Sequence, residues 1–478
     1  MTPPTRAAGP ARPGPEVRAA AEATVEGEAR ATAEAVGVVA AAEAARGFRS
    51  FLLIWAAQLV ARVGNGLTPF GLSVYVYQQT GLSTSVAVVT MAGFLPAMLL
   101  APLGGVLADR VDRRLLMILG GAFSAVGLLA LLVAFRGGAA SVPVICACLA
   151  FSSVFASVMD PAYRATITDL LPPAQYARAG GLTQLASASQ FLISPALAGL
   201  LMALSGVTLV VVVDVALMTV TTVCMVLIRR TITAAGPAPR RGVWADLRFG
   251  VAFLARNRNI TALVLLVTLV TFCMGFVQTL FTPMLLDLSS EQTLGVVRSG
   301  AAVGMVAASL AIGVLGTGHR HVRSIVTALA VGGVAVALMG ATTNVLLVGA
   351  FAFVFFLTLP ALNTSVEVLA RSSIPNATQG KVWGLIGLVS QLGYLVAYAV
   401  SGPLADFVFN PLLVPGGALA GTLGTLIGVG PSRGIGLMFV VVGVLLVVLA
   451  VVISRVKGMR TMEAHQERRV RDTSGVGS

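Results

Sequence analysis

Charge is scarce in this 478-residue sequence, in which only 11% of the residues are Asp, Glu, Lys or Arg. Soluble proteins average about 25%. Lysine occurs only twice, at positions 381 and 457, and the acidic residues number 19. Apolar residues make up 57% of the chain, and the mean hydropathy is +0.92. With so little polar surface to show to water, the chain is predicted to be a membrane protein.

The sequence also lacks the usual marks of an enzyme or a metal protein. No G-x-x-x-x-G-K-[ST] phosphate loop is present, so we expect no ATP-driven activity from this chain alone. His319 and His321 have no further ligands nearby in the sequence, and we interpret them as additional basic residues. We therefore expect no enzyme activity, no metal and no cofactor. The four cysteines all lie in apolar runs and are interpreted as packing residues: Cys146, Cys148, Cys224 and Cys273.

In place of charge the chain has long apolar runs. A helix needs about 20 mostly apolar residues to cross a bilayer. Because the runs are continuous and do not alternate in period two, they predict helices and not the strands of a membrane barrel. The fold class is thus all-α, with twelve predicted spans at about 52–77, 84–108, 115–135, 142–163, 180–205, 207–228, 260–286, 296–316, 323–342, 345–370, 382–405 and 434–454.

The basic residues are distributed unevenly between the two sides of these spans. Twelve spans place both termini on one side, and that side receives 24 Arg and Lys residues. The other side receives three, Arg136, Arg298 and Arg433. The asymmetry predicts a multi-pass protein of the cytoplasmic membrane with both termini in the cytoplasm. The net charge of +13 then reflects an anionic lipid surface as partner, and we expect no nucleic-acid binding.

Polar intervals divide the chain into two halves. The interval at 230–259 includes a predicted amphipathic helix from Asp246 to Arg258. The first 47 residues, Pro-rich and then rich in Ala, Glu and Arg, have no apolar stripe and are predicted to be mobile. The predicted organisation is an N-terminal extension at 1–47, a six-helix bundle at 48–229, a central cytoplasmic loop at 230–259, a second six-helix bundle at 260–457 with an extracellular loop at 407–433, and a cytoplasmic tail at 458–478.

The loop after the second span concentrates charge. Asp109 ends a predicted helix at its negative pole, so it needs a cationic partner, for which Arg113, Arg114 and Arg164 are candidates. We interpret this loop as a latch between the two halves, although an ordinary basic turn remains an alternative. The candidate gating residues are Gly105, Asp109, Arg110, Arg113, Arg114 and Arg164.

The pattern G-x-L-A-D-R-x-x-R-R at 105–114 resembles the loop between helices 2 and 3 of the major facilitator superfamily. Asp112 stands where that family usually has glycine. Further segments resemble its drug-efflux branch, which includes macrolide and enterobactin exporters: Asp160-Pro-Ala-Tyr-Arg164, Gly380-Lys-Val-Trp-Gly384 and Arg433-Gly-Ile-Gly-Leu437. The resemblance implies two six-helix bundles around a central cavity, alternating access, and export driven by a proton gradient.

An internal repeat supports this symmetry. The segment Gly105-Val-Leu-Ala-Asp109-Arg-Val111 recurs as Gly402-Pro-Leu-Ala-Asp406-Phe-Val408. The first copy ends the second span and the other ends the eleventh, at opposite predicted faces. Such inverted three-helix units are expected within transporters of this type.

Polar residues inside the spans are candidates for the cavity. Arg62 lies near the middle of the first span, where a cation costs at least roughly 2.5 kcal/mol on insertion scales. It is therefore expected to face water or an acid, unless it snorkels to the surface. The acids within spans are Asp160, Asp214 and Glu367. We favour local pairing of Asp160 with Arg164, leave Asp214 open between cavity and interface, and take Glu367 as the best cavity acid.

Neutral groups complete the candidates, since Asn65 and Gln278 are expected either to line the cavity or to bond a neighbouring helix. In the fifth span, Ser194-Pro195 resembles in weakened form the kink element of exporters. The predicted function is export of a small amphipathic molecule (a drug, siderophore or secondary metabolite) by a monomer, with substrate, protons and lipid as partners. A lipid or lysophospholipid translocator of the same fold, and a non-transporting scaffold or sensor, remain as alternatives.

Overall fold

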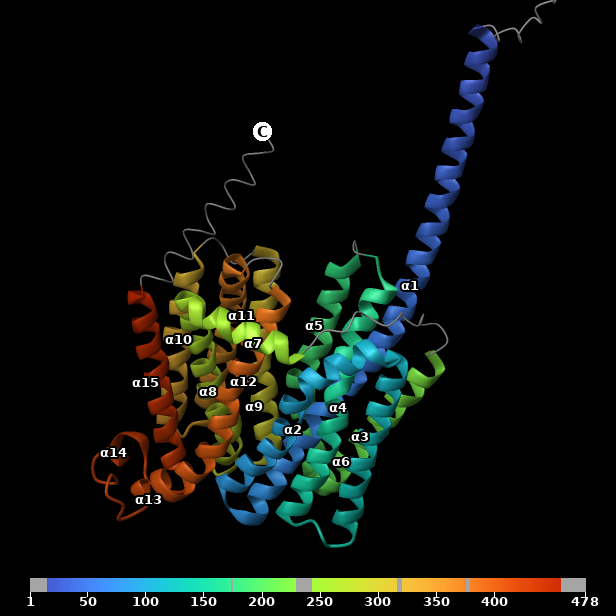
Figure 1. The fold of residues 1–478 in the computed structure, drawn as a ribbon. Helices are drawn as coiled ribbons and strands as arrows, with labels where there is room; N and C mark the ends of the chain where they lie inside the picture. Colours follow the sequence, from blue (N-terminus) through green and yellow to red (C-terminus); the bar gives the residue numbers. More distant parts are fainter. Residues whose placement is uncertain (1–14, 173–174, 229–242, 316–319, 375–378, 457–478) are drawn as a thin grey trace, which may run out of the picture.

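The computed structural model describes residues 15–172, 175–228, 243–315, 320–374 and 379–456. Side-chain environments are described from residue 47 onward within these ranges, except at 102, 105–106, 108–110, 165, 168–169, 177, 228, 243–247, 372–373 and 379–381. The described part is helical, and its helices form two bundles side by side (Figure 1). The all-α fold expected from the sequence is confirmed.

The N-terminal bundle is built by six helical elements, which pack with α1 against α6, α2 against α4 and α3 against α4. Its helices are α1 (Pro15–Thr80), α2 (Ser83–Arg110), α3 (Arg113–Arg136), α4 (Val142–Leu170), α5 (Tyr176–Leu192) and α6 (Ser194–Ile228).

The C-terminal bundle pairs α10 with α15, α10 with α11, and α8 with α12. Its elements are α8 (Arg258–Leu286), α9 (Glu291–Leu315), α10 (His321–Ala341), α11 (Val345–Ser373), α12 (Gln379–Leu404), the π-helix η3 (Ala405–Phe409), α13 (Asn410–Leu413), α14 (Gly424–Ile427) and α15 (Arg433–Arg455).

Eleven helices in the described ranges are long and apolar enough to cross a membrane. One of them, the stretch Arg178–Leu227, has 50 residues. A straight helix of that length would measure about 75 Å, whereas the hydrocarbon core is about 30 Å thick. The stretch divides at Ser205 and Gly206, where the backbone leaves the helical region and Gly206 has a φ of +69°. Two spans therefore replace one, in agreement with the division at 205–207 predicted from the sequence.

Helix α1 extends back to Pro15, because the Ala-rich tract continues a helix that the membrane span has already nucleated. The mobility of this extension stays a prediction. The segment expected to be a loop from Phe407 stays helical through η3 and α13 and turns only after Leu413. Asp112, the departure from the family pattern, accepts a hydrogen bond from the backbone nitrogen of Arg114 at 3.0 Å and so caps α3.

Two of the three basic residues assigned to the arginine-poor side are not in loops. Arg433 is 4% exposed and donates to the carbonyl oxygens of Ile427 and Gly340, each at 2.9 Å. It thereby satisfies acceptors that lipid could not. Arg298 lies two turns into α9. We use "arginine-poor end" for the ends of the bundles near Arg136 and Arg433, and "arginine-rich end" for the opposite ends.

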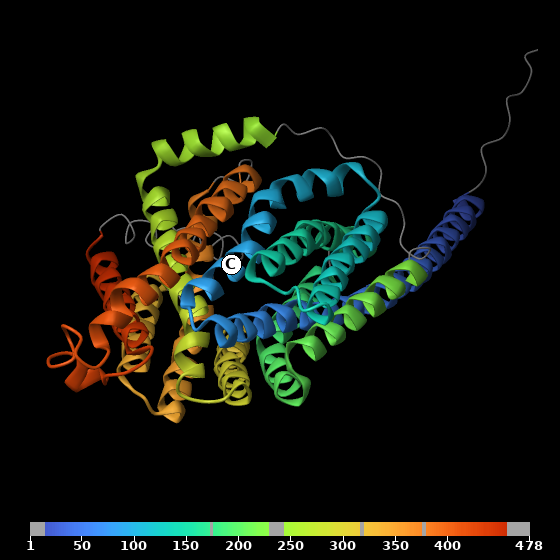
Figure 2. The same cartoon turned by 90° about the horizontal axis from the view of Figure 1, so that it is seen from below.

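The amphipathic helix expected at 246–258 is observed as α7 (Val243–Arg256). It lies across the end of the C-terminal bundle, at a steep angle to the spans (Figures 1 and 2). The packing there is tight, because a Cβ placed on Gly250 would lie 3.0 Å from a methyl carbon of Leu385 on α12. The helix therefore packs against the C-terminal bundle at the arginine-rich end.

The two bundles are joined at the arginine-poor end by Asp406 of η3. Its carboxylate accepts hydrogen bonds from the backbone nitrogens of Ser83 and Thr84, at 3.0 and 2.7 Å, and from the Thr84 hydroxyl at 2.7 Å. Ser83 and Thr84 form the first turn of α2, where backbone N–H groups have no partner inside the helix. An acid from one bundle thus caps a helix of the other.

Close backbone contact accompanies this cap. A Cβ on Gly402 would lie 2.5 Å from the Cα of Thr84, so α12 and α2 approach more closely there than any larger residue permits. A second contact joins the same ends: the Tyr77 hydroxyl of α1 lies 3.0 Å from both carboxylate oxygens of Asp287, which also accepts from Ser432. The bundles are therefore held together at the arginine-poor end by polar bonds as well as by packing.

Replacing Asp406 with Asn is expected to weaken this closure, because the variant keeps an acceptor but loses the charge that the α2 N-terminus stabilises. Such interactions are worth about 0.3–1 kcal/mol, so the ratio of closed to open protein should fall about two- to fivefold. Spin labels at exposed Ala139 and Thr343, one on each bundle, report the separation in a variant without the four cysteines.

The matched control is Glu291→Gln, which removes an acid from the same end but from the first turn of its own helix α9. An unchanged distance distribution for Asp406→Asn would show that the charge does not contribute to closure.

Candidate functional site

The centre of the N-terminal bundle contains an ion pair between α1 and α4. The guanidinium of Arg62 donates to Asp160, and the two side chains are 17% and 44% exposed. Arg62 lies inside its span and Asp160 lies one turn from the end of the span Val142–Arg164, where a charge surrounded by lipid is expensive. An accessible ion pair at this depth is consistent with a water-filled space between the helices.

This pairing corrects the local arrangement favoured from the sequence. Asp160 was expected to bond Arg164, one helical turn farther along α4, but it bonds Arg62 of α1 instead. Arg164 is exposed. Sequence spacing made Arg164 the available partner, whereas the cost of leaving Arg62 without an acid at mid-span favours the longer-range pair.

Asp214 is placed quite differently, in the seam between α6 and α1. Its residue exposure is 2%. One carboxylate oxygen accepts a hydrogen bond from the Thr68 hydroxyl, and the other is buried and has no hydrogen-bond partner in the described structure. A Cβ on Gly64 would lie 2.5 Å from that second oxygen, so the seam closes directly over the carboxyl group. The interfacial position left open for Asp214 is not the one observed.

The neutral candidate Gln278 lies on α8 in a polar and aromatic cluster. Its side-chain oxygen accepts from the Tyr398 hydroxyl at 2.9 Å, and its backbone carbonyl accepts from Arg298 at 2.9 Å. Asn65, in contrast, is partly buried on α1 beside Gly64. The structure therefore brings Gln278 into contact with Arg298, which the sequence assigned to the arginine-poor side and not to the cavity.

Arg298 of α9 contacts both bundles. Its guanidinium carbon lies 5.7 Å from the ring centres of Phe70 on α1 and Phe281 on α8. Next to it, Phe94 of α2 meets the Tyr398 ring edge-to-face at 5.3 Å. Cation–π contacts of this kind are strongest where water is excluded. The signal that could have identified Arg298 is its place in the eighth span, which begins earlier, at Glu291, than the predicted start at 296.

Glu367, predicted to be the best cavity acid, lies on an exposed part of α11. It accepts from Arg371, one turn later, with the Arg371 terminal nitrogen 2.5 Å from Glu367 Oε1. Arg371 also lies 5.9 Å from the ring centre of Trp383 on α12. An exposed pair within one helical turn contributes little to stability. Asp214 is thus far more enclosed than Glu367, and Asp160 differs from Glu367 in being paired with another helix.

The gating-loop candidates are described only in part. The side chains of Asp109 and Arg110, and the surroundings of Gly105, lie outside the described residues, although their backbone forms the end of α2. Arg113 and Arg114 begin α3, and the Nε atom of Arg114 lies 3.8 Å from Asp112. The predicted pairing of Asp109 stays a prediction.

The Ser194-Pro195 element lies where the fifth span is interrupted. Helix α5 ends at Leu192 and α6 begins at Ser194. The Ser194 hydroxyl donates to the carbonyl of Val63 on α1 at 2.7 Å, and the Ala196 backbone nitrogen donates to the Ser299 hydroxyl of α9 at 3.0 Å. The interruption is therefore bonded to α1 within its own bundle and to α9 of the other bundle.

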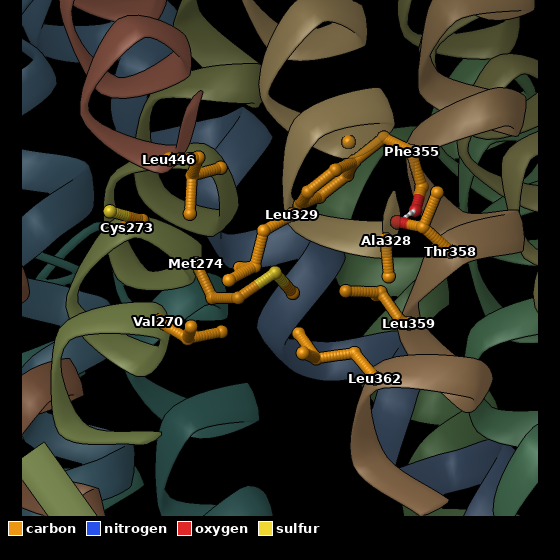
Figure 3. Close-up of a pocket in the computed structure, with 11 residues that line it drawn as sticks. Val270, Cys273, Met274, Ala328, Leu329, Phe355, Thr358, Leu359, Leu362 and Leu446 are labelled. Carbon is orange, nitrogen blue, oxygen red and sulfur yellow. Dashed lines mark hydrogen bonds between the residues drawn. The ribbon is translucent and has the colours of Figure 1, made fainter. Parts of the chain in front are cut away.

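A small crevice lies elsewhere, inside the C-terminal bundle between α8, α10, α11 and α15 (Figure 3). Its lining is apolar apart from Thr358, whose hydroxyl donates to the backbone carbonyl of Phe355 at 2.7 Å. It has no charged lining residue and does not include the Arg62–Asp160 pair. We interpret it as a packing defect, separate from the candidate site.

The arrangement has the chemistry of a binding and gating site and not of catalysis. It offers a solvent-accessible ion pair, a sealed acid and an aromatic cluster with a cation, distributed over helices of both bundles. Among the described residues no three His, Cys, Asp or Glu side chains are grouped to hold a metal. Such a site is suited to recognising a molecule that has both apolar and charged parts.

The comparisons with known proteins agree with this geometry. The chain is 24% identical to macrolide efflux protein A of Streptococcus pyogenes over 371 residues, which cover 74% of this chain and 89% of the relative. It is 25% identical to the multidrug efflux pump Tap of Mycolicibacterium fortuitum over the same length and shares of both chains.

Solved structures share the fold. The POT family transporter PepTSo superimposes with a TM-score of 0.68 at 12% identity, covering 87% of this chain and 98% of that one. A bacterial homologue of the human lysosomal transporter Spinster gives 0.64 at 13%, with shares of 88% and 98%. The family model described as Major Facilitator Superfamily matches residues 54–398. The chain therefore belongs to the major facilitator superfamily, and it is a multi-pass membrane transporter and not an enzyme.

Proposed function

We propose that this transporter exports a small amphipathic molecule in exchange for protons. The observation that supports this most directly is the Arg62–Asp160 pair, since an accessible ion pair inside the spans can exchange partners with a charged group on a substrate. The similar proteins named above are efflux proteins, which favours export over import. Because the sequence has no phosphate loop, a gradient is the remaining energy source, and the acids within the spans are the groups that a proton gradient can act on.

The proposal includes an orientation. The excess of basic residues places the arginine-rich end and both termini in the cytoplasm, and a bacterial efflux protein of this type belongs in the cytoplasmic membrane. The end joined by Asp406 and Asp287 then faces outward. In the described conformation the two bundles meet on that outer side, so the accessible Asp160 communicates with the cytoplasm, from which substrate is collected.

Substrate recognition is proposed to use charge exchange and aromatic contact together. A cationic group on the substrate competes with Arg62 for Asp160, while apolar rings pack against the aromatic residues near Arg298. Such contacts tolerate molecules of varied shape, because stacking and dispersion depend little on an exact fit. The likeness to macrolide and multidrug efflux proteins is consistent with this breadth.

Transport is best tested in inside-out vesicles with an imposed pH gradient, interior acid. We expect uptake of erythromycin or ethidium into vesicles containing the protein, and loss of uptake when the gradient is dissipated with nigericin. A fluorescent lysophospholipid forms a third arm of the assay. Movement of the lipid alone would support the lipid translocator, and gradient-independent accumulation of all three probes would contradict proton coupling.

Removing the central cation is expected to impair transport more than removing a peripheral one. Arg62→Ala leaves Asp160 inside a span without its partner, whereas Arg136 is exposed in the last turn of α3. Loss of one partner of a partly buried pair costs about 1.4 kcal/mol or more, and a cost of that size in the transport step reduces the rate about tenfold or more. Initial rates in the same vesicles, normalised to protein content, compare Arg62→Ala with Arg136→Ala. Equal rates would remove Arg62 from the site.

The gating loop gives a further prediction. Asp109→Asn is expected to abolish export without preventing membrane insertion, because the proposed closure of the cytoplasmic side depends on the charge at this position. Export in vesicles and the amount of inserted protein are measured together. Unchanged export by this variant would leave the loop as an ordinary basic turn.

A further inference from the structure

We propose that Asp214 is the proton-binding site that couples transport, and that it must be protonated for the outer side to close; this rests on the proposed proton-driven export. Three observations on one carboxyl group support it. The residue is 2% exposed, one of its oxygens has no hydrogen-bond partner in the described structure, and its other oxygen bonds only the neutral hydroxyl of Thr68. The seam formed by Gly64 leaves no space for water beside the unpartnered oxygen.

The surroundings of Asp214 offer no compensating charge. Of the elements packed against it, α1 brings Gly64 and Thr68 to the seam, which are four residues apart and share one face. Arg62, two residues before Gly64, lies about 200° around the same helix and is bound to Asp160. In the described part of the chain no basic side chain forms an ion pair with Asp214.

The other ionisable groups on these elements lie toward helix ends or in other contacts. They are Arg49, Tyr75 and Tyr77 on α1, Arg113, Arg114 and Arg136 on α3, Tyr176 and Arg178 on α5, Cys224 on α6, and Glu291 and Arg298 on α9.

Because Asp214 is buried without a counter-charge, the closed state favours its protonated, neutral form. An ionised carboxylate loses its hydration on entering the seam and gains only one hydroxyl contact in return, whereas the neutral acid loses far less. The proton forms an O–H bond on the carboxyl group and removes its negative charge, for which the seam provides no further hydrogen-bond donor. The closed conformation therefore binds the proton, and deprotonation opposes closure.

The outer contacts show how opening would reach this site. Helix α1 is held between α6, through Thr68 and Gly64, and the other bundle, through Tyr77 with Asp287 and Phe70 with Arg298. When the outer ends separate, the outer half of α1 loses its support on one side and can leave α6. Water from the external side then reaches Asp214 and exchanges its proton.

The direction of this coupling is the one an exporter needs. After substrate has left outward, an external proton binds Asp214 and permits the outer side to close, which returns the site to the cytoplasm. Entry of a cationic substrate at Asp160 raises the positive charge on the N-terminal bundle, and the proton then leaves Asp214 for cytoplasmic water that enters between α1 and α6 from the side of the Arg62–Asp160 pair, before the outer side opens. Each turn of the cycle thus exchanges one proton for one substrate at this group.

A structural role for Asp214 makes a different prediction. If the side chain served only as an acceptor for Thr68, asparagine would replace it without effect on pH dependence. The matched control is Thr221→Val, because the buried Thr221 hydroxyl donates to the Ala57 carbonyl at 3.2 Å across the same seam and does not titrate in this range. Loss of seam packing alone should affect both variants alike.

The first experiment needs no substrate. The distance between spin labels at Ala139 and Thr343 is measured in the purified cysteine-free protein from about pH 5 to 9. We expect the open population of the wild-type background to rise with pH, by up to about tenfold per pH unit for one linked proton. Asp214→Asn should stay closed at every pH, while Thr221→Val keeps the wild-type slope. A retained slope in Asp214→Asn would overturn the proposal.

The acids at the outer contacts are a separate source of closure, because Asp406 accepts from the first turn of α2 and Asp287 lies beside the Tyr77 hydroxyl. Asp406→Asn serves as a second background in which the Asp214-dependent slope should persist.

The second experiment separates this inference from the proposed function. In inside-out vesicles, Asp214→Asn should lose accumulation of erythromycin or ethidium driven by the pH gradient. If the wild type accumulates either probe and Asp214→Asn does so equally, the inference is wrong and the proposed function stands. If the wild type accumulates neither probe while its closure follows pH through Asp214, the proposed function is wrong and the proton site stands.

Discussion

The cost of placing charge inside a membrane-spanning bundle explains the contacts of the buried ionisable side chains in the described helices. Arg433 meets that cost with backbone carbonyls, Arg62 with an acid on another helix, and Arg298 with aromatic faces and the Gln278 carbonyl. In each case the partner comes from a different helix, so the charge fixes how those helices pack. Asp214, in contrast to these three arginines, has only a neutral hydroxyl as its partner in the described structure.

The same constraint explains the joined ends of the bundles. Asp406 needs donors, and the first turn of α2 has backbone N–H groups that need an acceptor. The contact satisfies both at once, and it forms only while the bundles touch. Gly402, one turn earlier, brings the helices close enough for this bond. A polar bond that exists in one conformation and is lost in another is what allows two bundles to exchange between stable arrangements.

Much of this architecture could be predicted from the sequence, because lipid limits the choices. The lengths of the apolar runs indicated the spans, including the division near Gly206. The positions of the basic residues predicted which loops lie on the same side. What the sequence could not supply was partner choice across long separations. Asp160 has Arg164 nearby in sequence but Arg62 in space. The repeat at 402–408 already pointed to Asp406, but its partner is a helix terminus, which no residue type marks.

In the proposed mechanism Asp160 and Asp214, the two candidate acids within spans of the N-terminal bundle, have different roles because their exposure differs. Asp160 is 44% exposed, so a substrate cation can reach it, whereas Arg62, at 17% exposed, must find another partner when it is displaced. Asp214 is sealed, so its charge state is linked to closure and hardly to substrate contact. Were one acid to serve both purposes, an accessible carboxylate would exchange protons with the cytoplasm in every conformation, and the gradient would leak. Asp160 and Asp214 contact different faces of α1. Proton binding and substrate binding therefore influence each other only through the position of that helix.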